Sequence, residues 1–322
     1  MSDVTVVALT IGEPYLDRAL ASAARQTLPA AATVVVRDVT PFHRALNAGA
    51  AQVRTPFFVQ LDADVILDDT CLETLRALMA DNVSITSGLL RDPIVGRTTG
   101  VRLYRTACFE TVRIRDSISP DLDFTTDTAC LGWVRRCALR WPSGDRARWH
   151  TVGDHRPDYT PLYTFSKFRL EGIRARYRRR EGRAALMLAR LCPSPHAAAT
   201  LALIATAHGF FDRDASDRLV PYRATPEFDT VHGFLADPSA GPALPMSNAA
   251  GAPPQQFRDA YAFAVECRRR GATAAFLAGL AHLRAGGPQA WIPLTGLCHG
   301  VFAEGFEPGH AAAEYAALRE IL

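Results

Sequence analysis

The stretch FFVQLDAD, residues 57–64, decides the fold class of this chain. Phe57–Leu61 is a short apolar run that predicts a buried strand, and Asp62-Ala63-Asp64 follows at its carboxyl end. Two carboxylates beside buried apolar residues are costly unless a cation compensates their charge. Because two aspartates one residue apart are common, a solvated turn at the strand end is the alternative interpretation of this tripeptide.

Predicted strands and helices alternate before this stretch. Val4–Leu9 and Thr33–Val36 are apolar runs typical of buried parallel strands. Leu16–Gln26 has the helical spacing of apolar residues, and a second helix is predicted from Pro41 to about Val53, with proline in its first turn. This order of elements predicts a mainly parallel α/β sheet flanked by helices, with right-handed crossovers.

Three aspartates lie at most three residues beyond the end of a predicted strand. Asp38 follows the second strand, and Asp62 and Asp64 follow the third. Because sheets of this kind bind ligands at the carboxyl ends of their strands, we expect these side chains at one ligand-binding edge. Carboxylate oxygens at such an edge suit Mg²⁺ or Mn²⁺ that bridges phosphates.

Further elements are predicted downstream. They are a helix over Leu72–Met79, strands over Ser84–Ser87 and Gly100–Tyr104, a helix over Asp127–Arg140 and an extended segment over Trp149–Val152. The remaining chain is predicted to be mostly helical, with a basic helix over residues 167–190, a loop or linker over Asp237–Pro254, and helices over Phe257–Arg270, Thr273–Arg284 and Ala311–Leu322.

Four segments of the first half resemble a known family. They are Leu9-Thr10 at the first strand end, ASAARQTLP at residues 21–29, ALNAG at residues 45–49, and FFVQLDAD. The second and third match the patterns S-x-x-x-Q-T-x-P and A-x-N-x-G. In this order and spacing they resemble the nucleotide-binding half of family-2-type, GT-A-fold glycosyltransferases. The resemblance predicts a GT-A nucleotide-sugar-binding and catalytic domain over 1–165 and a mostly helical domain over 166–322, which resembles no family.

The resemblance implies roles for individual residues. Contacts to the nucleotide sugar are implied for Leu9, Thr10, Glu13, Asp38, Asp62 and Ala63, and Mn²⁺ or Mg²⁺ would be held by Asp64 and His155. His150 is an alternative ligand, and a hydrogen-bonded structural role is the alternative for either histidine. Asp38 is the one acid where the family commonly has two. The identity of the nucleotide base that it would contact is therefore left open.

A general base is also implied by the resemblance. TDTACLGWVRR, residues 126–136, resembles the segment that carries it, with Thr126 in place of the usual glutamate and Asp127 as the base. The alternatives are Asp121, Asp123, or a plain aspartate at a helix N-terminus. The implied reaction is inverting transfer of a sugar, with a UDP-sugar as donor, to a hydroxyl acceptor in cell-surface polysaccharide or glycoconjugate synthesis.

Two other functions compete with this interpretation. A nucleotide-sugar-binding scaffold without catalysis would fit Thr126 and the short loop after Asp38. A sugar nucleotidyltransferase would also use a parallel sheet and acidic residues. Its Gly-rich basic loop is missing, because the chain reads TIGEP at residues 10–14.

Composition narrows the cell compartment and the partners. The 322 residues carry a net charge of +3, which gives no sign of nucleic-acid binding. The seven cysteines are odd in number and include no CxxC pair, which indicates reduced thiols in a cytosolic protein. No signal peptide or membrane-spanning stretch is recognised, so a cytoplasmic protein is expected. Nothing in the sequence indicates an oligomeric state.

Lys167–Arg183 is the one strongly basic segment. It is predicted either to bind anions or to form a helix face that is solvated or docks to acids of the first domain. The anions considered are a lipid-pyrophosphate acceptor, an acidic glycan and the anionic inner face of the membrane, where binding would be peripheral.

Overall fold

The computed structural model describes residues 2–137, 151–177, 191, 194, 196–212, 224–236, 246, 251–286 and 290–321. It divides into two units, Met1–Pro157 and Asp158–Leu322. The domain boundary predicted after residue 165 lies within helix α6, Pro161–Tyr177.

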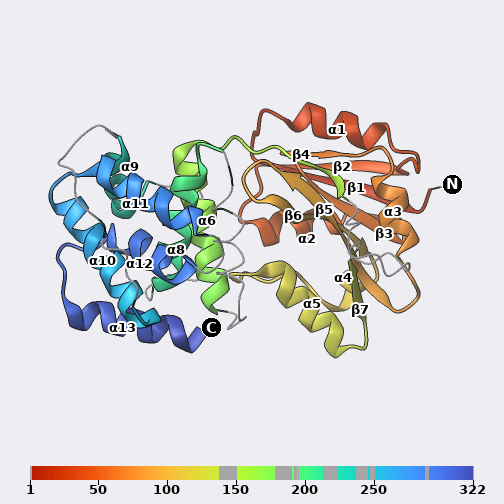
Figure 1. Ribbon diagram of the computed structural model, residues 1–322. Coiled ribbons are helices and arrows are strands. Elements are labelled where there is room, and N and C mark those ends of the chain that lie inside the picture. Colours follow the sequence, from red (N-terminus) through yellow and green to blue (C-terminus); the bar gives the residue numbers. More distant parts are fainter. Residues whose placement is uncertain are drawn as a thin grey trace. The chain divides into compact units, whose positions relative to one another are not determined.

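Unit 1 is built around one twisted sheet (Figure 1). The strand order is β2-β1-β3-β6-β5-β8-β4, and β7 pairs with β5. The bounds are β1 Val4–Thr10, β2 Ala32–Arg37, β3 Phe57–Asp62, β4 Val65–Leu67, β5 Val83–Asp92, β6 Gly96–Arg105, β7 Val134–Cys137 and β8 Thr151–His155. The helices are α1 Leu16–Ala24, α2 Phe42–Ala50, α3 Cys71–Ala77, α4 Cys108–Thr111 and α5 Pro120–Cys130.

Most strand pairs in this sheet are parallel. Strand β1 is parallel to β2 and β3, and β5 is parallel to β7 and β8. Strand β6 runs antiparallel between β3 and β5, and β4 is antiparallel to β8. Because β6 is antiparallel to both of its neighbours, β5 runs in the same direction as β3. The predicted α/β class is therefore confirmed, and the carboxyl ends of β1, β3, β5 and β8 share one edge.

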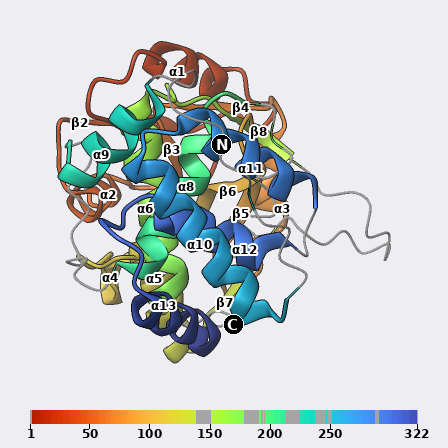
Figure 2. The same cartoon turned by 60° about the vertical axis from the view of Figure 1, so that its left-hand side comes forward.

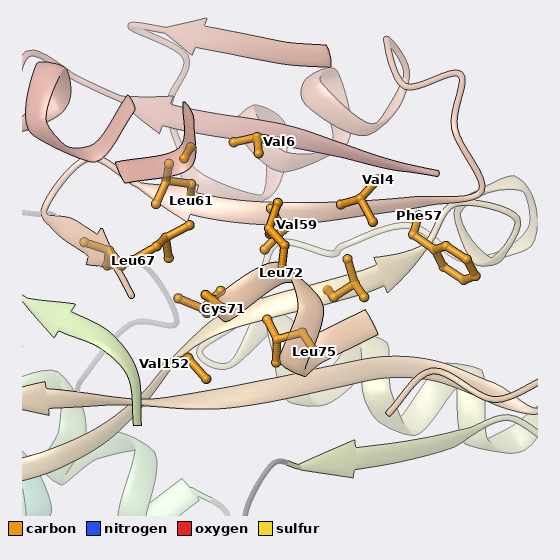
Figure 3. Close-up of a cluster of buried hydrophobic side chains, with 14 of the residues drawn as sticks. Val4, Val6, Phe57, Val59, Leu61, Leu67, Cys71, Leu72, Leu75 and Val152 are labelled. Carbon is orange, nitrogen blue, oxygen red and sulfur yellow. The ribbon is translucent and has the colours of Figure 1, made fainter. Parts of the chain in front are cut away.

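Alternate residues of the strands face two helical layers. Val4 and Val6 of β1 and Val59 of β3 pack with α1 and α3, as Figure 3 shows for Leu72 and Leu75. The intervening residues face the opposite layer, formed by α2, α4 and α5. This alternation follows from the two-residue period of a strand. It also places Gln60 and Asp62 on the α5 face.

The S-x-x-x-Q motif links α1 by hydrogen bonds to the segment that follows Asp62-Ala63-Asp64. The buried hydroxyl of Ser22 accepts a hydrogen bond from the Leu67 amide at 3.0 Å. The Gln26 side chain donates to the Asp68 carbonyl at 2.9 Å and accepts from the Leu72 amide at 2.9 Å. These bonds satisfy buried backbone groups, so this motif fixes the path of the chain that follows Asp64.

The A-x-N-x-G motif packs α2 against the sheet. Asn47 exchanges two hydrogen bonds with the backbone of Ile114, at 2.8 and 3.1 Å. A Cβ on Gly49 would lie 2.3 Å from Cγ1 of Val7, so the close approach of α2 to β1 needs glycine.

Two sequence predictions near the end of unit 1 are corrected. The helix predicted over Asp127–Arg140 is wrong, because α5 begins at Pro120 and ends at Cys130. Proline and the acids Asp121 and Asp123 favour a helix start, and Gly132 then takes a φ of +84° that ends the helical path before β7. The extended segment predicted over Trp149–Val152 also differs, because the described strand β8 continues past Val152 and ends at His155. Trp149 and His150 lie outside the described residues.

Unit 2 is mostly helical, as predicted. Its helices are α6, α8 Ala199–Phe211, α9 Pro226–Leu235, α10 Pro253–Arg269, α11 Thr273–Ala285, α12 Trp291–Gly300 and α13 Pro308–Ile321. The described part of the predicted basic helix ends with α6 at Tyr177, and residues 178–190 lie outside the description. Most of the predicted linker over Asp237–Pro254 also lies outside it, and α10 begins within that range. In the described chain, no helix combines the length and the apolarity needed to cross a membrane.

Helix α6 packs along α8, and α10 packs along α12 (Figures 1 and 2). A Cβ on Gly172 would lie 2.2 Å from the Thr206 carbonyl oxygen, and a Cβ on Gly209 would meet the Arg169 carbonyl oxygen. The two glycines therefore allow the backbones of α6 and α8 to approach closely.

Candidate functional site

The predicted nucleotide-binding residues come together at the carboxyl edge of the sheet. Leu9 lies opposite Asp62 in the β1–β3 pair, and Thr10 lies opposite Arg37 in the β1–β2 pair. The Asp38 amide donates to the Thr10 carbonyl at 2.9 Å. Asp38 has a φ of +56°, a left-handed conformation that aspartate tolerates better than most residues.

The loop after β1 is closed by Glu13. Its Oε2 accepts from the Thr10 hydroxyl at 2.6 Å and from the Ile11 amide at 2.9 Å. The Gly12 amide donates to the same hydroxyl at 3.0 Å. The Glu13 carboxylate thus shapes the loop that borders Leu9 and Asp38, and Ile11 is left exposed at its tip.

Asp62 ends β3 on the α5 face in a strongly perturbed environment. Its pKa is raised to about 6, mainly by burial and next by the charge of the nearby Asp64, against opposing effects from Gln60 and Arg102. Oδ1 of Asp62 accepts from the Gln60 side chain at 2.9 Å. A carboxylate that is costly to ionise in the folded chain gains most from a cation or a hydrogen-bond donor on a ligand.

A row of polar side chains continues from Asp62 across β6. Gln60 accepts from the Tyr104 hydroxyl at 3.3 Å, and Arg102 lies opposite Gln60 in the β3–β6 pair. Burial acts to lower the Arg102 pKa, but Asp121, Tyr104 and Asp62 raise it overall, so Arg102 stays cationic.

Asp121 reaches this row from the first turn of α5. Its Oδ2 lies 2.9 Å from a terminal guanidinium nitrogen of Arg102, and its charge is among those that raise the Asp62 pKa. Its other oxygen, Oδ1, is buried and has no hydrogen-bond partner in the described part of the chain. Asp121 therefore lies close to Asp62, with one oxygen paired to Arg102 and the other enclosed by the protein.

Asp127 lies in the last turns of the same helix. It pairs with Arg115 at 2.9 Å. The neighbouring Thr128 lies 3.3 Å from the hydroxyl of Ser84, near the start of β5. The next residue of β5, Ile85, lies opposite Tyr104 of β6, and Tyr104 lies opposite Phe58 of β3. Phe58 precedes Asp62 by four residues, which is about 13 Å along a strand. The structure thus brings Asp121, not Asp127, to the DxD end of the sheet.

Asp64, His155 and Asp92 form a chain of contacts beside Asp62. Asp64 follows the buried Ala63, and its carbonyl accepts from the Arg156 amide at 2.7 Å. Its Oδ2 lies 3.3 Å from Nε2 of His155, and Nδ1 of His155 lies 2.6 Å from Oδ2 of Asp92. The predicted pair of metal ligands is therefore adjacent, and a second carboxylate lies behind it.

The spacing of this pair fits a cation. Two ligands at right angles on Mg²⁺, with bonds of about 2.1 Å, lie about 3.0 Å apart, close to the 3.3 Å between Asp64 and His155. Within the described ranges, no group of three or more His, Cys, Asp or Glu side chains is arranged to hold a metal ion. Mg²⁺ is commonly bound by one or two carboxylates together with substrate phosphates, so two protein ligands suffice for a cation that arrives with a diphosphate.

Sequence reasoning missed Asp92, Gln60 and Arg102 as parts of this site. Asp92 follows an apolar run, as Asp38 and Asp62 do, and so carried the same strand-end signal. The strand was predicted to end at Ser87, whereas β5 continues to Asp92. Gln60 and Arg102 lie inside strands, where a polar residue gives no local sign of a site.

Comparisons with known proteins give distant similarity only. No protein-family model matches the chain, and no curated protein matches its sequence. The mannosyltransferase PcManGT from Pyrobaculum calidifontis, in complex with GDP-Man and Mn²⁺, is similar in structure, with 14% identity, 93% of this chain and 85% of that chain covered, and a TM-score of 0.45. TarS 1–349 from S. aureus in complex with UDP has 13% identity, 92% and 90% coverage, and a TM-score of 0.38. At these values the matches carry no weight for function, which we infer from the geometry of the site.

Proposed function

We propose that this chain is a metal-dependent glycosyltransferase that moves a sugar from a nucleoside-diphosphate sugar to a hydroxyl acceptor. The observation that supports it is the meeting of Asp62, the Asp64–His155 pair and Asp121 at one end of the sheet. A UDP-sugar is the proposed donor, and cell-surface polysaccharide or glycoconjugate synthesis is the proposed role.

The donor would lie along the carboxyl ends of β1, β2 and β3. Leu9, Thr10 and Asp38 border the place for the nucleoside, and the Glu13 carboxylate holds the loop beside it. Asp62 would accept hydrogen bonds from the donor's ribose or from water. Asp64 and Nε2 of His155 would hold a divalent cation, which supplies neutralisation of charge on the leaving diphosphate when bound.

The acceptor hydroxyl needs a base on the far side of the anomeric carbon. Sequence similarity favours Asp127 for this role, whereas the contacts of α5 favour Asp121, which opens the helix and lies near Asp62. We propose Asp121, whose partly exposed carboxylate would take the proton from the attacking hydroxyl. A single base with attack opposite the leaving group inverts the anomeric centre. Retention would need a second carboxylate as nucleophile.

The test is binding and turnover of UDP- and GDP-sugars with and without metal. Calorimetry should detect UDP or GDP binding that needs Mn²⁺ or Mg²⁺, and Asp64→Asn should weaken it at least about tenfold. Asp69→Asn is the control, because Asp69 is an exposed acid paired with Arg25. Equal affinity in excess chelator would refute the metal site. Metal-dependent binding without transfer or donor hydrolysis would indicate the non-catalytic scaffold instead.

A further inference from the structure

Asp92 is the most enclosed acid of the site. Its side chain is 1% exposed and lies at the end of β5, where the chain turns toward β6. Oδ1 accepts two backbone hydrogen bonds, from Ile94 and Val95, both at 2.8 Å. These bonds fix the carboxylate, and Oδ2 is then directed at His155.

The contact between Asp92 and His155 determines which ring nitrogen carries a proton. Oδ2 lies 2.6 Å from Nδ1, and an ionised carboxylate oxygen only accepts, so the bond requires a proton on Nδ1. In the neutral imidazole, Nε2 is then the nitrogen that presents an electron pair to a cation. Nε2 lies 3.3 Å from Oδ2 of Asp64, a spacing that suits two ligands of one divalent cation.

We propose that Asp92 is a positioning residue that orients the His155 ring and selects the tautomer able to bind a divalent cation with Asp64. This inference rests on the metal site of the proposed function. In this tautomer Nε2 of His155 and the Asp64 carboxylate both present electron pairs to a divalent cation. Outer carboxylates of this kind commonly hold metal-binding histidines in the correct orientation.

Asp92→Asn is the direct test. The oxygen of the Asn side chain can still accept from the Ile94 and Val95 amides, but its NH₂ group then faces Nδ1 of His155. The NH₂ group donates a hydrogen bond, so Nδ1 must present its electron pair instead of a proton. The ring should carry its proton on Nε2, toward Asp64. Mn²⁺ affinity, measured by electron paramagnetic resonance with the metal alone, should fall about 10- to 100-fold. Asp154→Asn removes the same charge one residue from His155, but Asp154 pairs with Arg91 and Arg156 instead. It should change the affinity less than about threefold.

Long-range proton–nitrogen NMR spectra of the His155 ring provide a second readout that does not depend on the variant's folding. In the wild-type protein with Mg²⁺ and UDP or GDP, Nδ1 should carry the proton and Nε2 should not. A ring without a proton on Nδ1 overturns the inference, and so does equal Mn²⁺ affinity of wild type and Asp92→Asn. If the wild type binds no Mn²⁺ even with UDP or GDP, the proposed metal-dependent function fails as well.

Discussion

Arg102 of β6 and Asp121 of α5 form an ion pair of 2.9 Å that joins the first turn of the helix to the polar row beside Asp62. The pair determines which end of α5 lies near the DxD. Asp121 and Asp123 are in the first turn, and Asp127 lies about one to two turns further along. A general base must lie within hydrogen-bond reach of the acceptor hydroxyl, so the ion pair bears directly on its identity.

We expect Asp121→Asn to lower sugar transfer by at least about a hundredfold, the common scale for loss of a general base. Donor binding should change little, because the base faces the acceptor. Asp127→Asn should keep most of the activity, since its partner Arg115 is exposed and Thr128 contacts the other end of β5. Steady-state kinetics with calorimetry of donor binding would measure both effects.

Asp123→Asn is the matched control for Asp121→Asn, and thermal unfolding of each variant shows whether the fold is kept. Loss of transfer in Asp127→Asn alone, with Asp121→Asn near normal, would restore the assignment that the sequence favours and reject ours.

Asp62 should make stability depend on pH. Its pKa rises from 3.8 to about 6 on folding, so between these values the folded chain binds more protons than the unfolded chain. Stability then falls as pH rises through this window. Without metal or nucleotide, Asp62→Asn should raise Tm at pH 7.5 by about 2–4 °C, equivalent to about 1 kcal/mol. The gain should disappear near pH 4. Calorimetric melts of both proteins across this range would show it, and a gain that does not depend on pH would contradict the explanation.

Two buried histidines of unit 2 should destabilise the chain in acid. Burial lowers the pKa of His208 to about 4 and that of His299 to about 3, against an ordinary value of 6.5. Below pH 6.5 the unfolded state binds more protons, so stability is lost as pH falls from 6.5 toward the folded values. Nδ1 of His299 has no hydrogen-bond partner in the described chain, and the ring packs against Phe211 with centroids 4.3 Å apart.

His299→Phe keeps an aromatic ring in place and should reduce the dependence of unfolding free energy on pH between about 4 and 6.5. Urea unfolding at several pH values is the measurement. His282→Phe, at an exposed position of α11, should leave the dependence unchanged. Parallel stability curves for wild type and His299→Phe would show that His299 is not responsible.

The basic segment should bind anionic vesicles mainly through its second part. Three of the four described cations on α6 already have partners. Arg169 pairs with Asp212, Arg174 lies 2.7 Å from Glu171, and Lys167 lies over the rings of Tyr159 and Tyr163. We therefore expect any salt-sensitive binding to depend on the arginines at 178, 179, 180 and 183, which lie outside the described residues.

Co-sedimentation with anionic vesicles would test this expectation. Replacing Arg178, Arg179 and Arg180 by glutamine should abolish binding at low salt, and Lys167→Gln should preserve it. Binding should also fall steeply with salt, because exposed charges are screened over about 8 Å at physiological ionic strength. If the wild type does not bind vesicles even at low salt, the anion-binding hypothesis is wrong and the solvated-face alternative is favoured.

Local patterns determined the scaffold of the site. The apolar runs before Asp38 and Asp62 predicted β2 and β3, and strand–helix alternation predicted their parallel order, because both depend on periodicity over a few residues. The S-x-x-x-Q and A-x-N-x-G motifs were recognisable in sequence. The contacts of Gln26 and Asn47 in the structure show that their side chains hydrogen-bond to the backbone of distant segments.

The tertiary structure decided which acids meet. The sequence determined that carboxylates would end β2 and β3, since a strand carries its last residue to the sheet edge whatever packs around it. Asp92 joins His155 because β5 runs parallel to β3 and β8, a consequence of long-range pairing that a short sequence window does not contain. Asp121, rather than Asp127, contacts the polar row beside Asp62 because α5 begins at Pro120 and its first turn pairs with Arg102 on another element. Helix bounds and ion pairs of this kind depend on residues distant in sequence, so they are determined only when the chain packs.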